Sequence, residues 1–171
     1  MGAFVAVYNY LGFHLVDRPF SLPVWVVTLL FLAYLSGTVS SPCAGALATR
    51  HGRYPVLLAS IAVMAGGATL MIAPLTVVVL AGLVLFTAGF FGAHAVASGW
   101  VPVSAPPASR AQASSLYYFG YYAGSSVFGW LLGLVLTSAG WTWFVVVTLL
   151  LCVASASAAA AALHSAPNGR A

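Results

Sequence analysis

The sequence predicts an all-α membrane protein, a polytopic helical bundle with five full spans and a shortened first one. Hydrophobic residues make up 63% of the 171-residue chain and charged residues only 4%, whereas soluble domains carry about 25% charged residues. The few charges divide the chain into long uncharged runs, which suit helices that cross a bilayer. Such a surface faces lipid over most of its area, so the lipid bilayer is the first expected partner.

Composition also excludes several functional classes. There is no lysine, Asp17 is the single acid, and the net charge of +4 comes from scattered arginines. Nucleic-acid binding is not expected, because no basic stripe could neutralise successive phosphates. Cys43 and Cys152 lie in apolar runs and are predicted to be small buried thiols, not a disulfide or a metal pair. We expect no metal, cofactor or enzyme activity, and residues 1–13 do not have the pattern of a cleavable signal peptide.

The first two spans follow from the hydropathy at the start of the chain. A helix needs about 20 apolar residues to cross about 30 Å of hydrocarbon. Residues 1–13 are apolar but reach only about 20 Å at about 1.5 Å per residue, so they are interpreted as the second half of a span whose beginning is missing. The first full span is expected at 24–47, within the uncharged run 19–49.

The two remaining uncharged runs each suit two spans. Residues 54–109 break at Pro74, which disfavours helix just before it and restarts the next helix. Residues 111–169 break at Gly140, and Trp141 serves there as an interfacial anchor. The predicted spans are 55–73, 76–99, 110–136 and 142–163, followed by a tail at 164–171.

The arginines indicate how the spans are oriented. Two spans separate Arg50 and Arg53 from Arg110, and two more separate Arg110 from Arg170. Because an even number of crossings returns the chain to the same side, these four arginines share one face of the membrane. The loops on the opposite face carry only Asp17 and Arg18, whose charges cancel. The positive-inside rule therefore predicts that the arginine face and the C-terminus are cytoplasmic.

The segment GALATRHGR, residues 45–53, places two arginines in one loop. Its spacing resembles the signature loop of the major facilitator superfamily, roughly Gly-x-Leu-Ala-Asp-Arg-x-Gly-Arg-Arg, which joins the second and third helices of each six-helix half. Thr49 stands where the family usually has Asp, and Tyr54 stands where a further Arg is common. This degenerate form of the motif is typical of the C-terminal half. The matching positions are Gly45, Leu47, Ala48, Arg50, Gly52 and Arg53.

Other segments extend the resemblance along almost the whole chain. The chain looks like the C-terminal half of the YnfM-like bacterial inner-membrane transporters, which are grouped with drug and sugar efflux proteins. The resemblance implies twelve helices in two halves around a substrate cavity, each half built from two inverted three-helix repeats. Residues 1–163 would then form the C-terminal half. The segments are YNYLGFHL, PFSLP, FLAYLSGTVSSPCAGALATRHGR, FFGAHAVASGWV and RAQASSLYYFGYYAGSSVFG.

The resemblance also implies which helices line the cavity. The third and sixth helices of a half lie outermost in the family, against lipid. The matching segments here, 55–73 and 142–163, are the most uniformly apolar of the predicted spans. Polar and aromatic residues collect in the first, fourth and fifth helices, where each polar group needs an explanation. The cavity candidates are Tyr8, Asn9, Tyr10, His94, Ser98, Tyr118 and Tyr121.

Each candidate also has a simpler structural interpretation. Asn9 could present its amide to a substrate, or it could make an interhelical hydrogen bond worth about 0.6 kcal/mol. His94 is the one ionisable residue deep in a span; it could carry a proton, or it could be a neutral histidine bonded to a carbonyl or hydroxyl. The tyrosines suit amphipathic or cationic substrates, or they pack and form an interfacial belt. The glycines expected to permit close helix packing are Gly120, Gly124, Gly129 and Gly133.

These observations predict a transporter half. Proton-coupled transporters usually move the proton on an embedded carboxylate, yet no span here contains one. Acid partners for Arg50 and Arg53 would lie in a complementary N-terminal half, in a second copy, or in lipid phosphate. We expect a fragment or split subunit of a proton-coupled secondary transporter that exports a small solute. The alternative is a six-span interaction or scaffold protein, or a remnant, that transports nothing.

Overall fold

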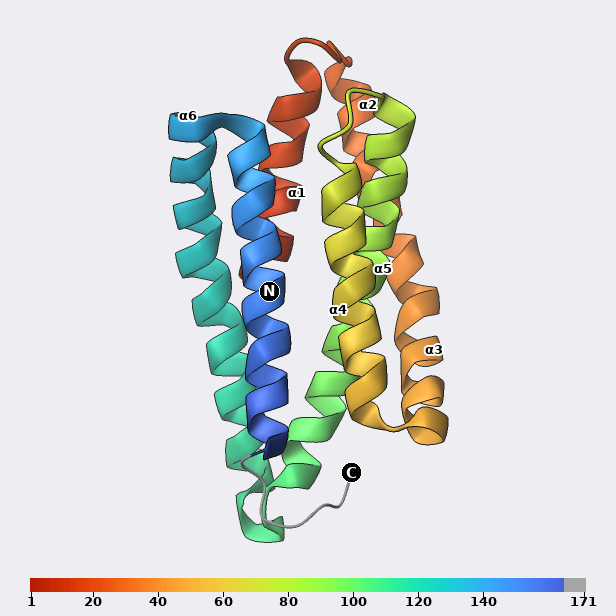
Figure 1. Cartoon of the computed structure of the whole chain (residues 1–171), viewed down its shortest axis with the longest axis vertical. Coiled ribbons are helices and arrows are strands. Elements are labelled where there is room, and N and C mark those ends of the chain that lie inside the picture. The colour runs from red at the N-terminus through yellow and green to blue at the C-terminus, as the bar shows by residue number, and fades with distance from the viewer. Residues whose placement is uncertain (165–171) are drawn as a thin grey trace.

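The computed structural model describes residues 1–164 as helices joined by short links (Figure 1). No strand occurs among these residues, so the predicted all-α class is confirmed. The tail from residue 165 on, with Arg170, lies outside the described residues. The elements are α1 (Gly2–Val16), α2 (Val24–Thr28), the 3-10 helix η1 (Leu29–Tyr34), α3 (Leu35–His51), α4 (Arg53–Leu70), α5 (Thr76–Ser104), the 3-10 helix η2 (Pro107–Ser109) and α6 (Arg110–His164).

The helices are long and apolar enough to form a polytopic membrane bundle. The four segments that qualify are Val24–His51, Arg53–Leu70, Thr76–Ser104 and Pro107–Ala161. The last of these contains two crossings, because the chain reverses at Gly140, where φ is 82° and ψ is −178°. Figure 1 shows the resulting hairpin, with a first arm before Gly140 and a second arm after it. Together with the shorter α1, this is the fold class expected from the sequence.

Helix ends extend past the positions that hydropathy indicates. α3 continues to His51, beyond the expected residue 47, and α5 continues to Ser104, beyond residue 99. Hydropathy marks where a helix leaves the hydrocarbon, whereas the hydrogen-bonded backbone continues into the interface. The turn between α3 and α4 is made by Gly52, whose φ of 88° is unfavourable for other residues.

The closest packing joins α4 to α5. A Cβ at Gly67 would collide with the backbone of Phe86 and with the carbonyl oxygen of Gly82, and a Cβ at Gly89 would collide with the backbone of Met64. Small residues let helices approach in this way, which gains van der Waals contact where the hydrophobic effect between helices is absent.

α1 packs against α6 and, less extensively, against α5. Its residues Val7, Leu11 and Leu15 are fully buried. Near its end, the ring of His14 stacks on Trp141 with 4.3 Å between centroids. The indole Nε1 of Trp141 donates a 2.8 Å hydrogen bond to the carbonyl oxygen of Met71. The α6 turn is therefore fixed to both α1 and the end of α4.

The prediction that both cysteines are buried is wrong for Cys43. Cys152 is buried, whereas Cys43 is exposed on α3, and both are free thiols. An apolar run shows that a helix lies in lipid, but it does not show which of its faces meets protein. Cys43 lies on a face of α3 that no other described helix covers.

Two adjacent glycines of α4 give a direct test of the α4–α5 contact. Gly67→Ala places a methyl group against the α5 backbone and is expected to cost about 1–3 kcal/mol of stability. Gly66→Ala is the control, because nothing lies within 4 Å of a Cβ at that position. Thermal unfolding in detergent should show a lower midpoint for Gly67→Ala alone. Equal midpoints would contradict the close α4–α5 packing.

Candidate functional site

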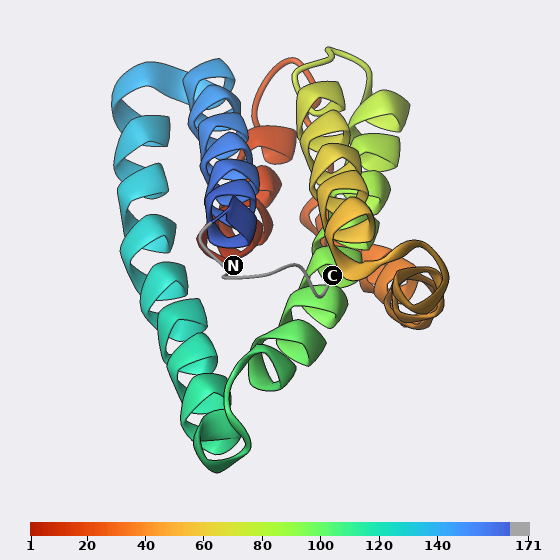
Figure 2. The same cartoon turned by 60° about the horizontal axis from the view of Figure 1, so that its bottom comes forward.

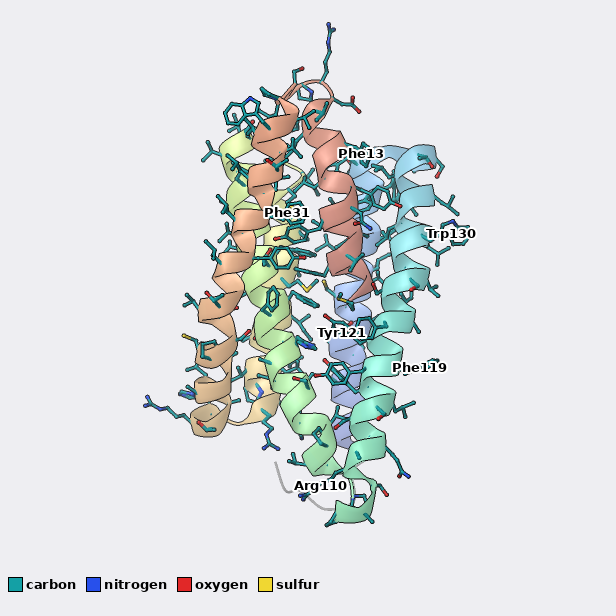
Figure 3. The ribbon with its side chains drawn as sticks, turned by 180° about the vertical axis from the view of Figure 1, so that it is seen from behind. Phe13, Phe31, Arg110, Phe119, Tyr121 and Trp130 are labelled. Carbon is teal, nitrogen blue, oxygen red and sulfur yellow. The ribbon has the colours of Figure 1, made fainter. Side chains whose placement is uncertain are left out.

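One face of the bundle presents α1 and α5 between two flanking walls. Figure 3 views this face, with α1 between the α2–η1–α3 path and the first arm of α6. The labelled Tyr121 lies between the first arm of α6 and α5, while Phe119 and Trp130 of the same arm point away from it. Aromatic side chains from all of these helices meet here in two connected groups.

The first group surrounds His94 of α5, and we call it the His94 cluster. The imidazole Nδ1 lies 2.9 Å from the hydroxyl oxygen of Tyr117 on α6, a hydrogen bond in which the tautomer decides the donor. Ring centroids lie 4.9 Å away for Tyr121, 6.4 Å for Tyr118 and 6.0 Å for Phe90. The imidazole of His94 is therefore enclosed by aromatic rings, and its polar contact is a phenol.

The second group surrounds Tyr8 of α1, and we call it the Tyr8 cluster. The hydroxyl of Tyr8 lies 2.7 Å from Oγ1 of the buried Thr87 on α5. Its ring centroid lies 4.9 Å from that of Phe4, 5.7 Å from that of Phe31 and 4.6 Å from that of Tyr34. Phe31 and Tyr34 keep 59% and 37% of their surface exposed, so the α2–η1–α3 wall offers open aromatic surface.

Two phenylalanines connect the clusters. Phe4 and Phe90 stack with 3.9 Å between centroids and an angle of 16° between ring planes. Phe90 in turn stacks on His94. Ring contacts therefore run without a break from Phe31 to the first arm of α6, through the buried rings of Phe4 and Phe90.

A cavity of about 540 Å³ adjoins the His94 cluster. Residues of α1, α4, α5 and both arms of α6 line it, and His94, Tyr117 and Tyr121 are among them. Its volume lies within the range of small-molecule sites. Of the predicted candidates, His94 and Tyr121 line this cavity together. Tyr118 belongs to the His94 cluster but does not line the cavity.

The other cavity candidates lie apart from this cavity. Asn9 is exposed, and its amide makes no hydrogen bond with another described residue. Tyr10 points the opposite way from Tyr8, because residues two apart on a helix face different sides, and its ring packs edge-on against Phe144. Ser98 donates a hydrogen bond to the carbonyl oxygen of Ala95 in its own helix.

The candidate packing glycines differ in their surroundings. The side chain of Tyr10 lies directly over Gly133, and the carbonyl oxygen of Gly124 lies beside Gly2. A Cβ at Gly129 would meet only a methyl group of Val5, at 3.8 Å. Among the described residues nothing lies within 4 Å of a Cβ position at Gly120 or Gly124, so of the four glycines only Gly133 leaves room that a side chain of α1 occupies.

The signature loop lies at the end of the bundle opposite the Gly140 turn (Figure 1). Arg50 and Arg53 are exposed, and within residues 1–164 neither guanidinium forms an ion pair. The turn residue Gly52 separates the two helices, as described above, while Gly45 is exposed near the end of α3. No group of three or more His, Cys, Asp or Glu residues that could hold a metal occurs in this part of the chain.

Sequence reasoning missed several members of the two clusters. Phe31, Tyr34 and Tyr117 were not among the candidates. The FLAY segment carries Phe31 and Tyr34 three residues apart, which places them on one helix face. That spacing was available in the sequence, but lipid-facing aromatics give the same pattern.

Comparison with known proteins agrees with this arrangement. Residues 3–170 match the sequence profile of the Major Facilitator Superfamily. The chain is 44% identical over 143 residues to the inner membrane transport protein YnfM of Escherichia coli and 40% identical over 141 residues to the uncharacterised MFS-type transporter YybF of Bacillus subtilis. It is 36% identical over 141 residues to an uncharacterised transporter of Buchnera aphidicola. These matches cover 82% of this chain but 34–35% of the relatives, so the chain spans about a third of their length.

The hydrogen bond between His94 and Tyr117 can be tested with two neighbouring tyrosines. Tyr117→Phe removes the hydroxyl that contacts the imidazole and is expected to destabilise the protein by about 0.6 kcal/mol, the average for interhelical hydrogen bonds in membranes. Tyr118→Phe is the control, because no hydrogen bond joins its hydroxyl to another described residue. Denaturant unfolding in mixed micelles should separate the variants; identical losses would contradict the specific contact.

Proposed function

Because this chain belongs to the Major Facilitator Superfamily, we propose that it forms part of a secondary transporter that moves a small solute across the bilayer. The supporting observation is the chain of ring contacts through the Tyr8 and His94 clusters, which begins on the exposed ring of Phe31. An open face of this kind in one half suits a solute site at the interface of two halves, where alternating access takes place.

The clusters favour a flat or amphipathic solute. Aromatic rings bind apolar surface and attract cations over their faces, and phenol hydroxyls add hydrogen bonds. Tyr8, Tyr34, Tyr118 and Tyr121 supply both properties. Asn9 would contribute an amide that is free to bind a polar group. Ser98 and Tyr10 would stabilise the helices that carry these residues.

We further propose that the transporter is driven by protons and works outward, with a complementary six-helix half or a second copy as partner. The described spans contain no carboxylate, so a proton would be carried by His94 or by an acid in the partner. His94 suits this task because an imidazole titrates near neutral pH and Tyr117 can exchange a hydrogen bond with it.

The orientation follows from the charge asymmetry between the two ends. The α3–α4 turn and the start of α6, which carry Arg50, Arg53 and Arg110, lie at one end of the bundle (Figure 1). The link from α1 to α2, which carries Asp17 and Arg18, lies at the other end. We place the arginine-rich end in the bacterial cytoplasm according to the positive-inside rule.

Cysteine labelling tests this orientation. In a chain with Cys43 and Cys152 changed to Ala, Thr49→Cys and Ser138→Cys place single thiols at opposite ends of the bundle. An impermeant thiol reagent added to intact cells should label Ser138→Cys, and it should label Thr49→Cys only after the inner membrane is opened. Labelling of both from the same side would contradict the proposed orientation.

A dye-efflux assay tests transport. The chain is co-expressed with the N-terminal six-helix half of the Escherichia coli relative, and ethidium serves as a flat cationic probe. The pair should lower dye accumulation, whereas either half alone should not. Tyr121→Ala should abolish the effect, because Tyr121 belongs to the His94 cluster, and Tyr122→Ala, whose side chain is 63% exposed, should preserve it.

The outcomes of this assay separate the two functional classes. Equal dye accumulation with the pair and with single halves would favour an interaction or scaffold protein. In an active pair, His94→Gln reports on the proton path. If efflux loses its pH dependence, His94 carries the proton; if the dependence persists, an acid of the partner carries it.

A further inference from the structure

A second cavity lies at the arginine-rich end of the bundle, and we call it the loop crevice. α5 diverges from α3 and α4 toward α6 in its final turns, as Figure 2 shows. The space left between them is about 970 Å³. The end of α3, the Gly52 turn, the first turn of α4 and residues 95–100 of α5 border it, and no residue that lines the cavity at His94 takes part.

The lining of the loop crevice contains basic side chains and no acidic one. His51 and Arg53 line it, and Thr49 adds a hydroxyl. The only acid in the sequence, Asp17, follows α1 at the opposite end of the bundle. Within residues 1–164, Arg53 has no ion-pair partner. A guanidinium at the edge of the hydrocarbon is stabilised by an anion with which it can form paired hydrogen bonds.

The backbone beside Arg53 adds to this preference. α4 begins at Arg53, and its N-cap residue Gly52 has no side chain that could bond the free N–H groups of the first turn. Such groups and the helix dipole favour a negative charge at this end. The cationic side chain and the backbone therefore favour the same kind of ligand.

The rest of the lining indicates a lipid. Trp100 is half-buried beside the crevice and Tyr54 lies in the first turn of α4, and both residue types prefer the level of lipid headgroups. Val96 and Pro55 supply an apolar floor. A basic pocket between membrane helices at the cytoplasmic side suits an anionic headgroup, whose acyl chains remain in the bilayer.

We propose that the loop crevice binds the phosphate group of an anionic phospholipid, with Arg53 as its main contact and His51 and Thr49 beside it. Trp100 and Tyr54 pack against the glycerol region. This site is separate from the solute site, and it does not depend on which solute the protein carries or on the coupling ion.

Native mass spectrometry of the full chain in detergent tests the proposal. Phosphatidylglycerol should bind as a discrete adduct, and phosphatidylcholine should bind more weakly. Arg53→Gln should weaken phosphatidylglycerol binding about tenfold, the loss expected for a hydrogen-bonded charged group. Arg50→Gln is the matched control, because it removes the same charge from the same loop but does not line the crevice. Equal weakening by both variants would show diffuse attraction and overturn the proposal.

A charge-neutral variant provides an independent test. Gly99→Leu should obstruct the α5 side of the loop crevice, and nothing lies within 4 Å of a Cβ at that position to oppose the new side chain. It should therefore lose the adduct. Gly66→Leu is the control, since that glycine is equally open but borders neither cavity. Both variants should keep the wild-type unfolding midpoint. Retention of the adduct in Gly99→Leu would overturn the proposal.

Competition distinguishes the possible sources of the anion. Inorganic phosphate in large excess should leave the phosphatidylglycerol adduct in place, because the acyl chains and aromatic contacts add to lipid binding. Displacement of the lipid by phosphate alone would identify a site for free anions. Loss of the adduct when the complementary half is added would identify a carboxylate of that half as the natural partner. Either result would overturn lipid binding at this site.

Discussion

The backbone in hydrocarbon can hydrogen-bond only to itself, and the whole architecture depends on that constraint. Every described element is therefore helical, and the helices are left to associate through packing, since lipid is as apolar as they are. The α4–α5 pair meets this need with Gly67 and Gly89, where backbone lies against backbone. α1 then packs against α6 and, less extensively, against α5, and the Trp141 indole fixes the α6 turn to α4.

Much of this fold could be predicted from very few residues. The charges and the turn residues Pro74 and Gly140 were sufficient to locate the breaks between helices, because each interrupts an apolar run. The face that each helix presents could not be predicted in the same way. A side chain against lipid and one against protein are equally apolar, which is why Cys43 was misplaced and Phe31 was overlooked. The pairing of His94 with Tyr117 depends on the crossing of α5 and α6, which no local pattern encodes.

Some polar side chains in the spans are paired by hydrogen bonds, and others are not. Tyr8 pairs with Thr87, His94 pairs with Tyr117, and Thr148 bonds to the carbonyl oxygen of Phe144. An unpaired polar group in hydrocarbon costs free energy, so these bonds offset the cost of placing the groups there. Among the described residues, the exposed amide of Asn9, the buried Oγ of Ser40 and the hydroxyl of Tyr118 have no hydrogen-bond partner. A residue with unmet hydrogen bonds on the open face is the one most in need of a solute or a partner helix.

The two cavities lie on different faces of the same short stretch of α5. His94 and Ala97 face the cavity beside the aromatic clusters, whereas Ala95 and Gly99 face the loop crevice. Backbone hydrogen bonds between residues four apart tie the two sets of lining residues into one helix. The position of α5 is set from one side by its glycine contact with α4 and from the other by the His94–Tyr117 bond, so both ends of the bundle depend on the same helix.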